Sequence, residues 1–264
     1  MNITDFGNAL LETGDLDPVY IMLHRARKEE AMSQRALHRW LVAYWCLYHS
    51  GAAAFLADSN DFWATLETAA INEGLKWPRG AERRHWRGEN ARQSQQHLSS
   101  AFIGPEEVVQ YLANGEPRSF AGVSARAKKL VGFGPWIAFK VADMLDRVAG
   151  FPVDFTGADL SIYKEPAAAS DLYLAQCDPN GYSVSMSKAG RLRLTITRLT
   201  SAFSSHKAPP LYDRPVNLQE VETIMCKWKS HMGGHYEVGK DTKELRHSLD
   251  CWGPLATRLK EFVP

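Results

Sequence analysis

A glycine-rich turn followed by an aspartate is the first pattern in this sequence that could support chemistry. The turn is Gly132-Phe133-Gly134, and Asp154 follows in a Val-Asp step. Glycine lacks a Cβ, so its backbone can adopt positive φ and approach another backbone closely. Pro135 suits the first position of a helix, where its missing N–H has no helical partner in any case. The pattern predicts a helix whose N-terminal amides face an anion such as phosphate, with a carboxylate nearby.

A cluster of arginines interleaved with tryptophans is the second candidate. Its members are Arg79, Arg83, Arg84 and Arg87, with Trp77 and Trp86 between them. Arginine offers bidentate contacts to phosphate, and tryptophan offers a flat surface for stacking on bases. A solvated helix face with ordinary ion pairs explains the same charges about equally well. Phosphate recognition is therefore one of two hypotheses for this segment.

Other acidic residues compete with Asp154 for a functional role. With Thr156, Asp154 could simply cap a following helix, and Asp159 is a nearby rival carboxylate. Asp143 and Asp146 lie on the helix predicted after the turn, together with Lys140 and Arg147, and we expect surface ion pairs there. The position of Asp154 after the glycine turn favours it as the functional carboxylate, kept ionised by basic groups and a helix N-terminus.

A histidine and glycine segment near the C-terminus is the third candidate. His231 and His235 are four residues apart, but the Gly-Gly pair between them would break a helix that presents both rings. The spacing is not typical of a zinc site, and we expect no metal. A loop whose amides bind an anion is the better interpretation, with Lys240 as its first candidate cation and Lys229 as a second.

Composition narrows the classes of protein that this chain could belong to. The four cysteines, Cys46, Cys177, Cys226 and Cys251, are scattered, so an iron–sulfur cluster is not expected and a reducing compartment is. The N-terminus does not have the features of a signal peptide, and no apolar run is long enough for a membrane span. We expect a cytoplasmic protein without a cofactor. The net charge of +1 says nothing about partners.

Almost all of the elements that must position these residues are predicted to be helices. Apolar residues recur at helical spacing over 37–48, 61–73, 105–114, 119–130, 135–150, 188–204, 218–232 and 241–262, the last broken near 253–254. We expect Asn60 to cap the second of these segments. The aromatic stripe on 37–48 is expected in the core rather than as a base-stacking surface. The predicted fold is all-α, with two helical lobes around a cleft.

The glycine turn between two helices, with Asp154 after it, resembles the helix-hairpin-helix DNA glycosylases of the endonuclease III superfamily. The resemblance implies a single domain over 1–264, a hairpin at about 119–150 and a C-terminal helical segment from about 216. Trp136 stands where bifunctional members carry a Schiff-base lysine, so lyase chemistry through that position is not supported. The four-cysteine cluster of many members is also missing.

Several segments together resemble a narrower family, the phage amino acid:DNA transferases, also called α-glutamyl/putrescinyl-thymine pyrophosphorylases. They are residues 77–88, 132–147, 153–155 and 234–241. The resemblance implies that an amino acid or other small amine replaces the phosphate of phosphorylated 5-hydroxymethyl-deoxyuridine in double-stranded viral DNA. Such hypermodified thymidine would resist host restriction nucleases. The target base would be flipped out of the duplex, because its reactive carbon is hard to reach inside the stack.

This chemistry assigns provisional roles to the candidate residues. Asp154 would take a proton from the amine, and Arg79, Arg83, Arg84 and Arg87 would stabilise the departing phosphate. Lys240 would hold the carboxylate of the donor. The expected DNA contacts are Gly132, Phe133, Gly134, Trp136 and Lys140. Two rivals remain open: a monofunctional DNA glycosylase that uses the same hairpin and aspartate, and a non-catalytic DNA-binding module.

Overall fold

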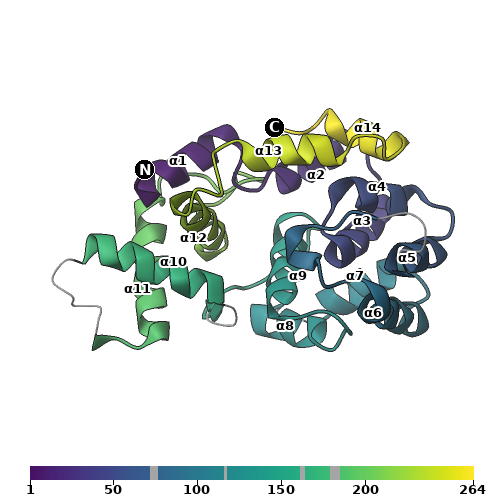
Figure 1. The fold of residues 1–264 in the computed structure, drawn as a ribbon, viewed down its shortest axis with the longest axis horizontal. Helices are drawn as coiled ribbons and strands as arrows, with labels where there is room; N and C mark the ends of the chain where they lie inside the picture. The colour runs from purple at the N-terminus through teal and green to yellow at the C-terminus, as the bar shows by residue number, and fades with distance from the viewer. Residues whose placement is uncertain (72–76, 116–117, 161–163, 179–184) are drawn as a thin grey trace. The chain divides into compact units, whose positions relative to one another are not determined.

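The protein is all-α over the part of the chain that the structure describes, as the sequence predicts. The computed structural model describes residues 1–71, 77–115, 118–160, 164–178 and 185–264, which contain no strand (Figure 1). Extended pairing in these residues is limited to two isolated bridges, Ser119 with Asp154 and Lys207 with Pro215. The segment expected to be helical over 188–204 forms a helix over Lys188–Ala202, which confirms that prediction.

The chain divides into two compact units, each built from segments distant in sequence. Unit 1 comprises Met1–Ile21, Phe155–Lys243 and Pro264, and unit 2 comprises Met22–Asp154 and Glu244–Val263. Two helical units agree with the expected lobes, whereas the cleft and the single domain over 1–264 stay predictions. The helices of unit 1 are α1 (Ile3–Thr13), α10 (Lys164–Cys177), α11 (Lys188–Ala202) and α12 (Leu218–Met232).

Unit 2 carries the candidate site and holds most of the remaining helices. They are α3 (Gln34–Leu47), α4 (Ser50–Asp58), α5 (Phe62–Ile71), the 3-10 turn η1 (Ala81–Arg83), α6 (Gly88–Ala101), α7 (Pro105–Ala113), α8 (Phe120–Ala127), α9 (Pro135–Arg147) and α14 (Pro254–Lys260). Helices α2 (Pro18–Lys28) and α13 (Lys240–Ser248) run across the boundaries between the units.

Helix α3 forms the core of unit 2, because its aromatic stripe is buried. Trp40 and Trp45 are fully buried, and Tyr44 stacks on Trp40 with ring centroids 4.5 Å apart. Ser33 starts the helix by accepting a hydrogen bond from the amide of Ala36. The prediction that these aromatics form a core is confirmed.

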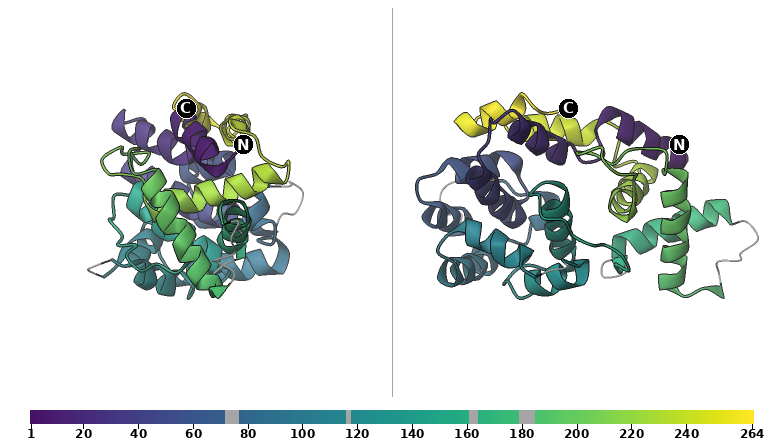
Figure 2. Two further views of the ribbon diagram at one scale, coloured as in Figure 1. Left: turned by 90° about the vertical axis from the view of Figure 1, so that its left-hand side faces the viewer. Right: turned by 180° about the vertical axis from the view of Figure 1, so that it is seen from behind.

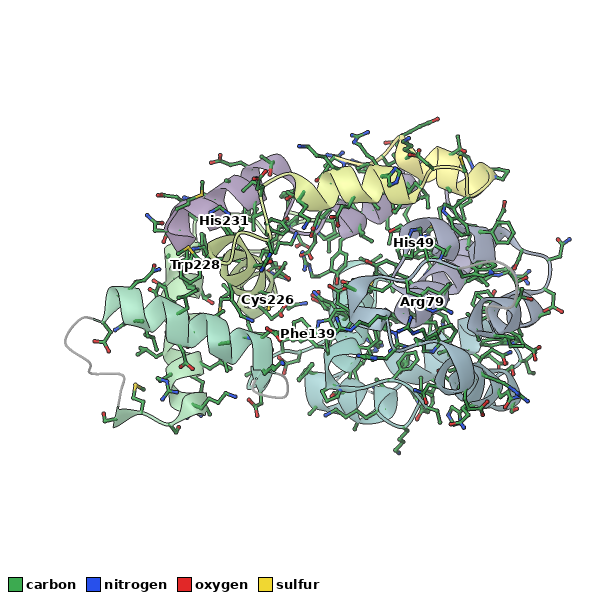
Figure 3. All side chains as sticks on the ribbon, viewed as in Figure 1. His49, Arg79, Phe139, Cys226, Trp228 and His231 are labelled. Atoms are coloured by element: carbon green, nitrogen blue, oxygen red, sulfur yellow. The ribbon has the colours of Figure 1, made fainter. Side chains whose placement is uncertain are left out.

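Helix α12 occupies the centre of unit 1 and packs against α1, α10 and α11. Trp228 is fully buried, and its indole N–H donates to the carbonyl of Met1 at 3.2 Å (Figure 3). Asn217 and Glu220 form a capping box at the start of α12, and Arg214 pairs with the fully buried Glu220 at 2.9 Å. Helices α10 and α11 cross steeply beside it (Figure 2).

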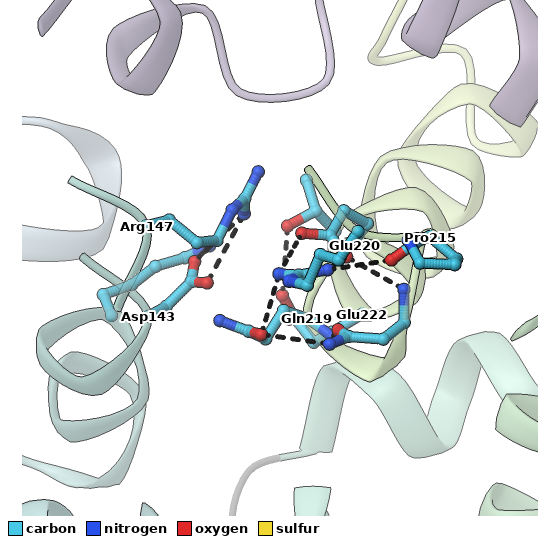
Figure 4. Close-up of polar contacts among 10 residues, drawn as sticks. Asp143, Arg147, Pro215, Gln219, Glu220 and Glu222 are labelled. Carbon is cyan, nitrogen blue, oxygen red and sulfur yellow. Dashed lines mark hydrogen bonds and ion pairs between the residues drawn. The ribbon is translucent and has the colours of Figure 1, made fainter. Parts of the chain in front are cut away.

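Two sequence predictions about helix ends and ion pairs are corrected by the structure. Asp61, not Asn60, caps α5, because its carboxylate accepts from the amide of Ala64 at 3.0 Å. The Asp143–Arg147 pair on α9 is buried rather than on the surface, with Arg147 Nη1 3.4 Å from Asp143 Oδ1 (Figure 4). A helix face that lies in the interior carries the same charge spacing as one in solvent, so the sequence alone could not separate the two.

His49 couples the stability of unit 2 to pH. Its ring nitrogen Nδ1 accepts a hydrogen bond from the amide of Ala52 at 3.1 Å and so caps α4. Burial, followed by the charge of His247, lowers the pKa of His49 to about 4. The unfolded chain therefore binds a proton more readily than the folded chain between about pH 6.5 and 4. Stability supplied by the neutral ring is present above this window and is lost as the pH falls through it.

We expect the free energy of unfolding to fall as the pH is lowered from 7 to 4. In His49→Asn, which can still cap α4 but cannot titrate, this fall should be smaller by about 1–2 kcal/mol, a figure reduced for the partial exposure of the ring. Urea unfolding at each pH measures the difference. The matched control His85→Asn removes an exposed ring and should keep the wild-type slope, and equal slopes in all three proteins would refute the role of His49.

Candidate active site

The predicted glycine turn links α8 to α9 in unit 2, and the two helices pack together. Phe120 of α8 meets Phe139 of α9 edge to face, with centroids 6.0 Å apart. Gly132 has φ +83°, as the sequence predicts, whereas Gly134 caps α9 with φ −81°. The amide of Phe133 donates to the carbonyl of Leu130 at 3.0 Å. The turn itself thus uses this amide, which argues against a bond from it to DNA, and the contact of the turn with DNA stays a prediction.

Gly132 also allows a close approach between the turn and α6. A Cβ at this position would lie 3.0 Å from Oγ of Ser94 and 3.2 Å from its Cβ. Ser94 in turn donates to the carbonyl of Val131 at 2.7 Å. The positive φ favours glycine here, and the tight contact with Ser94 adds to that preference.

The two aromatic residues of the turn differ in exposure. The ring of Phe133 is buried, which argues against direct stacking on a base. Trp136 is half-buried and meets Tyr48 edge to face, with centroids 4.9 Å apart. Of the two, Trp136 is the better placed for contact with DNA.

The arginine cluster separates into inward and outward members. Arg79 donates to the carbonyls of Trp77, Ala69 and Trp86 (Figure 3). Arg83 is buried and donates to the carbonyls of Cys46 and Gly132. Arg84 and Arg87 are exposed. The sequence treats the four as equivalent, but only the last two lie where a surface phosphate can reach them.

Lys140 lies on α9 among buried charges instead of on a DNA-facing surface. It is 8% exposed, and its Nζ lies 4.0 Å from Oδ2 of the fully buried Asp143. Asp146 of the same helix accepts a hydrogen bond from the amide of Val153 at 3.0 Å. The arrangement argues against a direct contact between Lys140 and DNA phosphate.

Asp154 lies at the surface on a backbone that is held on both sides. Its amide donates to the carbonyl of Arg118 at 2.6 Å, and its carbonyl accepts from the amide of Phe120 at 2.8 Å. These bonds form the bridge beside Ser119, the residue that caps α8. The alternative of a helix cap is wrong, because a turn rather than a helix follows Asp154. The main chain that carries this exposed carboxylate is therefore held next to the first turn of α8.

The loop after α12 does bind a negatively charged group, and that group is the carboxylate of Asp15 in the same chain. Asp15 is fully buried, and its carboxylate accepts from the amides of Gly239 and Thr242 at 2.7 and 2.8 Å and from two hydroxyls. The hydroxyls are those of Tyr236, at 2.6 Å, and Thr242, at 2.7 Å. Burial raises the pKa of Tyr236, and the charges of Asp241 and Asp15 add to the effect. Nothing in the residues around Asp15 predicts this role.

The basic and histidine side chains of this loop have local roles. Lys240 is exposed and donates to the carbonyl of His235 at 2.8 Å, while Lys229 pairs with Glu165. His231 bonds through Nδ1 with the carbonyl of Tyr236 at 2.9 Å. Across the described residues, no group of three or more His, Cys, Asp or Glu side chains is arranged to hold a metal ion.

We expect Asp15→Asn to lower the free energy of unfolding by about 2–4 kcal/mol. The amide group keeps one acceptor oxygen and points its own N–H donors at the donors that Asp15 satisfies, so buried groups lose their partners. The control Asp5→Asn changes an exposed aspartate in the first turn of α1 and should cost less than about 1 kcal/mol. Urea unfolding of both variants measures the difference, and equal small losses would contradict the role of Asp15.

Comparison with known proteins adds the decisive observation. Residues 11–236 match the family described as amino acid:DNA transferase. The chain belongs to the amino acid:DNA transferase family. A glycinyltransferase of Pseudomonas phage PaMx11 is 42% identical over 99% of this chain and 94% of its own length. A putrescinyltransferase of Delftia phage PhiW-14 is 29% identical over 98% of this chain and 82% of its own length.

The family match bears on the candidate residues of this transferase. It includes the glycine turn, the arginine cluster and Asp154, and it ends before Lys240. Both relatives align with almost the whole chain, so their similarity extends beyond the matched region. Among the described residues, no helix of the transferase is long and apolar enough to cross a membrane.

Proposed function

We propose that this transferase joins a small amine, an amino acid such as glycine or serine, to 5-phosphomethyl-deoxyuridine in viral double-stranded DNA. The single observation that carries the proposal is the 42% identity with a phage glycinyltransferase over nearly the full length of both chains. The more distant putrescinyltransferase transfers a different amine by name, which is consistent with a shared scaffold and a variable donor. The product would be a hypermodified thymidine that protects the DNA from host restriction.

The reaction balances as a displacement at the methylene carbon attached to C5 of the pyrimidine. The amine nitrogen forms a bond to this carbon as the carbon–oxygen bond to phosphate breaks. The electron pair of that bond leaves with the phosphate oxygen. The nitrogen must release a proton to become nucleophilic, and a base in the site must accept it. The pyrimidine must be flipped out of the duplex before the attack.

Asp154 is the proposed base, and it also orients the donor ammonium before attack. Its exposure allows contact with substrate, and the paired bonds to Arg118 and Phe120 fix the backbone that carries it. A base that is fixed before the substrate arrives spares the cost of ordering it during the reaction. Its bridge to Ser119 brings its main chain beside the start of α8, close to the turn that would hold the DNA backbone.

The exposed arginines and the turn supply the contacts with phosphate. Arg84 and Arg87 are the proposed partners of the leaving phosphate, because charge fixed in advance stabilises a growing negative charge. The N-terminal end of α9, with Gly134 and Trp136, is the proposed contact with the DNA backbone. Lys240 is the proposed partner of the donor carboxylate.

We expect the purified protein, when it is given a mixture of amino acids, to convert phosphomethyl-deoxyuridine in a duplex to a thymidine whose C5 methyl carbon carries the amino acid through its amine nitrogen. Mass spectrometry of the digested nucleosides identifies both the product and the donor. The same samples, scored for abasic sites, test the DNA glycosylase alternative. Abasic sites without a modified nucleoside would refute the transferase reaction.

We expect Asp154→Asn to lower turnover by about 100-fold or more and to change the affinity for DNA by less than about twofold, because only proton transfer is removed. The control is Asp159→Asn, which changes the other exposed aspartate of this loop and should retain turnover. Single-turnover assays with phosphomethyl-deoxyuridine DNA and glycine measure the rates. Wild-type turnover in Asp154→Asn would remove this residue from the mechanism, and loss only in Asp159→Asn would transfer the role to that residue.

A further inference from the structure

Arg83 makes an unusual set of contacts for a residue in a basic cluster. It is 8% exposed, and its Nη1 donates to the carbonyl of Gly132 at 2.8 Å while its Nε donates to the carbonyl of Cys46 at 3.0 Å. The guanidinium also lies over the ring of Phe133, 5.7 Å from the centroid. One side chain thereby ties the end of α3, the arginine-bearing segment and the glycine turn together.

The charge of Arg83 lacks the usual compensation for a buried cation. Within the described residues, it makes no ion pair with an acidic side chain, and its Nη2 is buried without a hydrogen-bond partner. Cys46 supplies no negative charge, because burial raises the pKa of its thiol to about 12. Burial of an unpaired charge opposes folding, so folding stability alone does not account for arginine at this position.

The segments that Arg83 joins are those that present positive charge to solvent. Arg84 and Arg87 follow Arg83 directly in the chain, and both are exposed. On the other side of the bond, Lys128 and Lys129 are exposed just before Gly132. Ser94 adds a second tie, from α6 to Val131. Two separate segments that carry exposed lysines or arginines are thus tied to each other through the hydrogen bonds of Arg83, and Ser94 also bonds to the turn.

We propose that Arg83 is a positioning residue for DNA binding: it locks the Arg84–Arg87 segment to the glycine turn, so that the two segments meet the phosphate of the target base and the phosphates of the DNA backbone as one rigid surface. The proposal rests on the proposed function, which requires the protein to hold duplex DNA around a flipped base. Arg83 does not touch phosphate. Its effect on DNA passes through Gly132 on one side and through Arg84 and Arg87 on the other.

A fixed surface and a flexible one differ in a way that can be measured. When two segments are held in register, phosphate contacts from both form together, and each contact steepens the dependence of binding on salt. When the tie is lost, one segment binds while the other moves independently. Loss of the tie should therefore lower both the affinity for DNA and the salt slope. Removal of Arg87 should then weaken DNA binding less than it does in the wild-type protein.

The test compares Arg83→Lys, Arg87→Gln and the double variant by fluorescence anisotropy with a phosphomethyl-deoxyuridine duplex, over a range of salt concentrations and without an amine donor. Lysine keeps the charge but cannot bridge both carbonyls. We expect Arg83→Lys to weaken binding about 10-fold and to lower the salt slope by about one. Arg87→Gln should lower the affinity for the duplex about 5-fold in the wild-type protein but less than about 2-fold in the Arg83→Lys background.

The matched control is Arg39→Lys in the same unit. Arg39 also donates to a main-chain carbonyl, that of Ser59, lies over an aromatic ring and has a buried nitrogen without a hydrogen-bond partner, but it is on α3 away from the turn. The Arg39→Lys variant should lose thermal stability but keep the affinity for DNA and the salt slope of the wild-type protein. If Arg83→Lys behaves like Arg39→Lys, or if the effects of Arg83→Lys and Arg87→Gln multiply, the positioning role is wrong.

A second variant serves if Arg83→Lys does not fold. Ser94→Ala removes the other tie to the turn and should lower affinity and salt slope in the same direction, by about 3-fold in affinity. An unchanged slope in this variant would also overturn the proposal. These assays need no turnover, so wild type that binds DNA but makes no modified nucleoside would refute the proposed reaction and leave the positioning role standing.

Discussion

The close contact between the glycine turn and the segment before α6 is the constraint on which the candidate site depends. A backbone without a Cβ at residue 132 leaves room for Ser94, which donates to the carbonyl of Val131, while Arg83 donates to the carbonyl of Gly132 itself. A Cβ at this position would press on Ser94 and would also oppose the positive φ. The positions of α9, its N-terminal end and the exposed arginines all follow from this contact. The chemistry of the site is therefore built on a backbone approach more than on any one side chain.

A second backbone contact places the proposed base. The bridge between Ser119 and Asp154 ties the loop after α9 back to the start of α8, so both ends of the hairpin are closed. Asp146 reinforces the closure through the amide of Val153. A carboxylate on an untied loop would sample many positions, and each would cost entropy when substrate binds. Exposure of the residue and a held position occur together at Asp154 because its main chain is bonded to Arg118 and Phe120.

The sequence predicted the helices well because their signals are local. Helix α12 has the predicted bounds, and the aromatic stripe of α3 is buried as its spacing indicates. Predictions that depend on tertiary contacts were less successful. Arg83 and Arg84 are neighbours of the same type, yet one is buried and the other exposed, and only packing against the turn decides which. The buried role of Asp15 could not be predicted, because the groups that donate to its carboxylate lie more than two hundred positions away in the chain.

Both units depend on residues from distant parts of the chain, which has a consequence for synthesis on the ribosome. Helix α14, near the C-terminus, packs on α4, and the carbonyl of Ser248 lies so close to Gly51 that a Cβ there would be 2.0 Å away. The first helix of unit 1, α1, likewise packs against α12, which is synthesised much later. Neither unit can complete its core until nearly the whole polypeptide has emerged. The nascent chain must therefore keep apolar helix faces exposed through most of translation, when aggregation competes with folding.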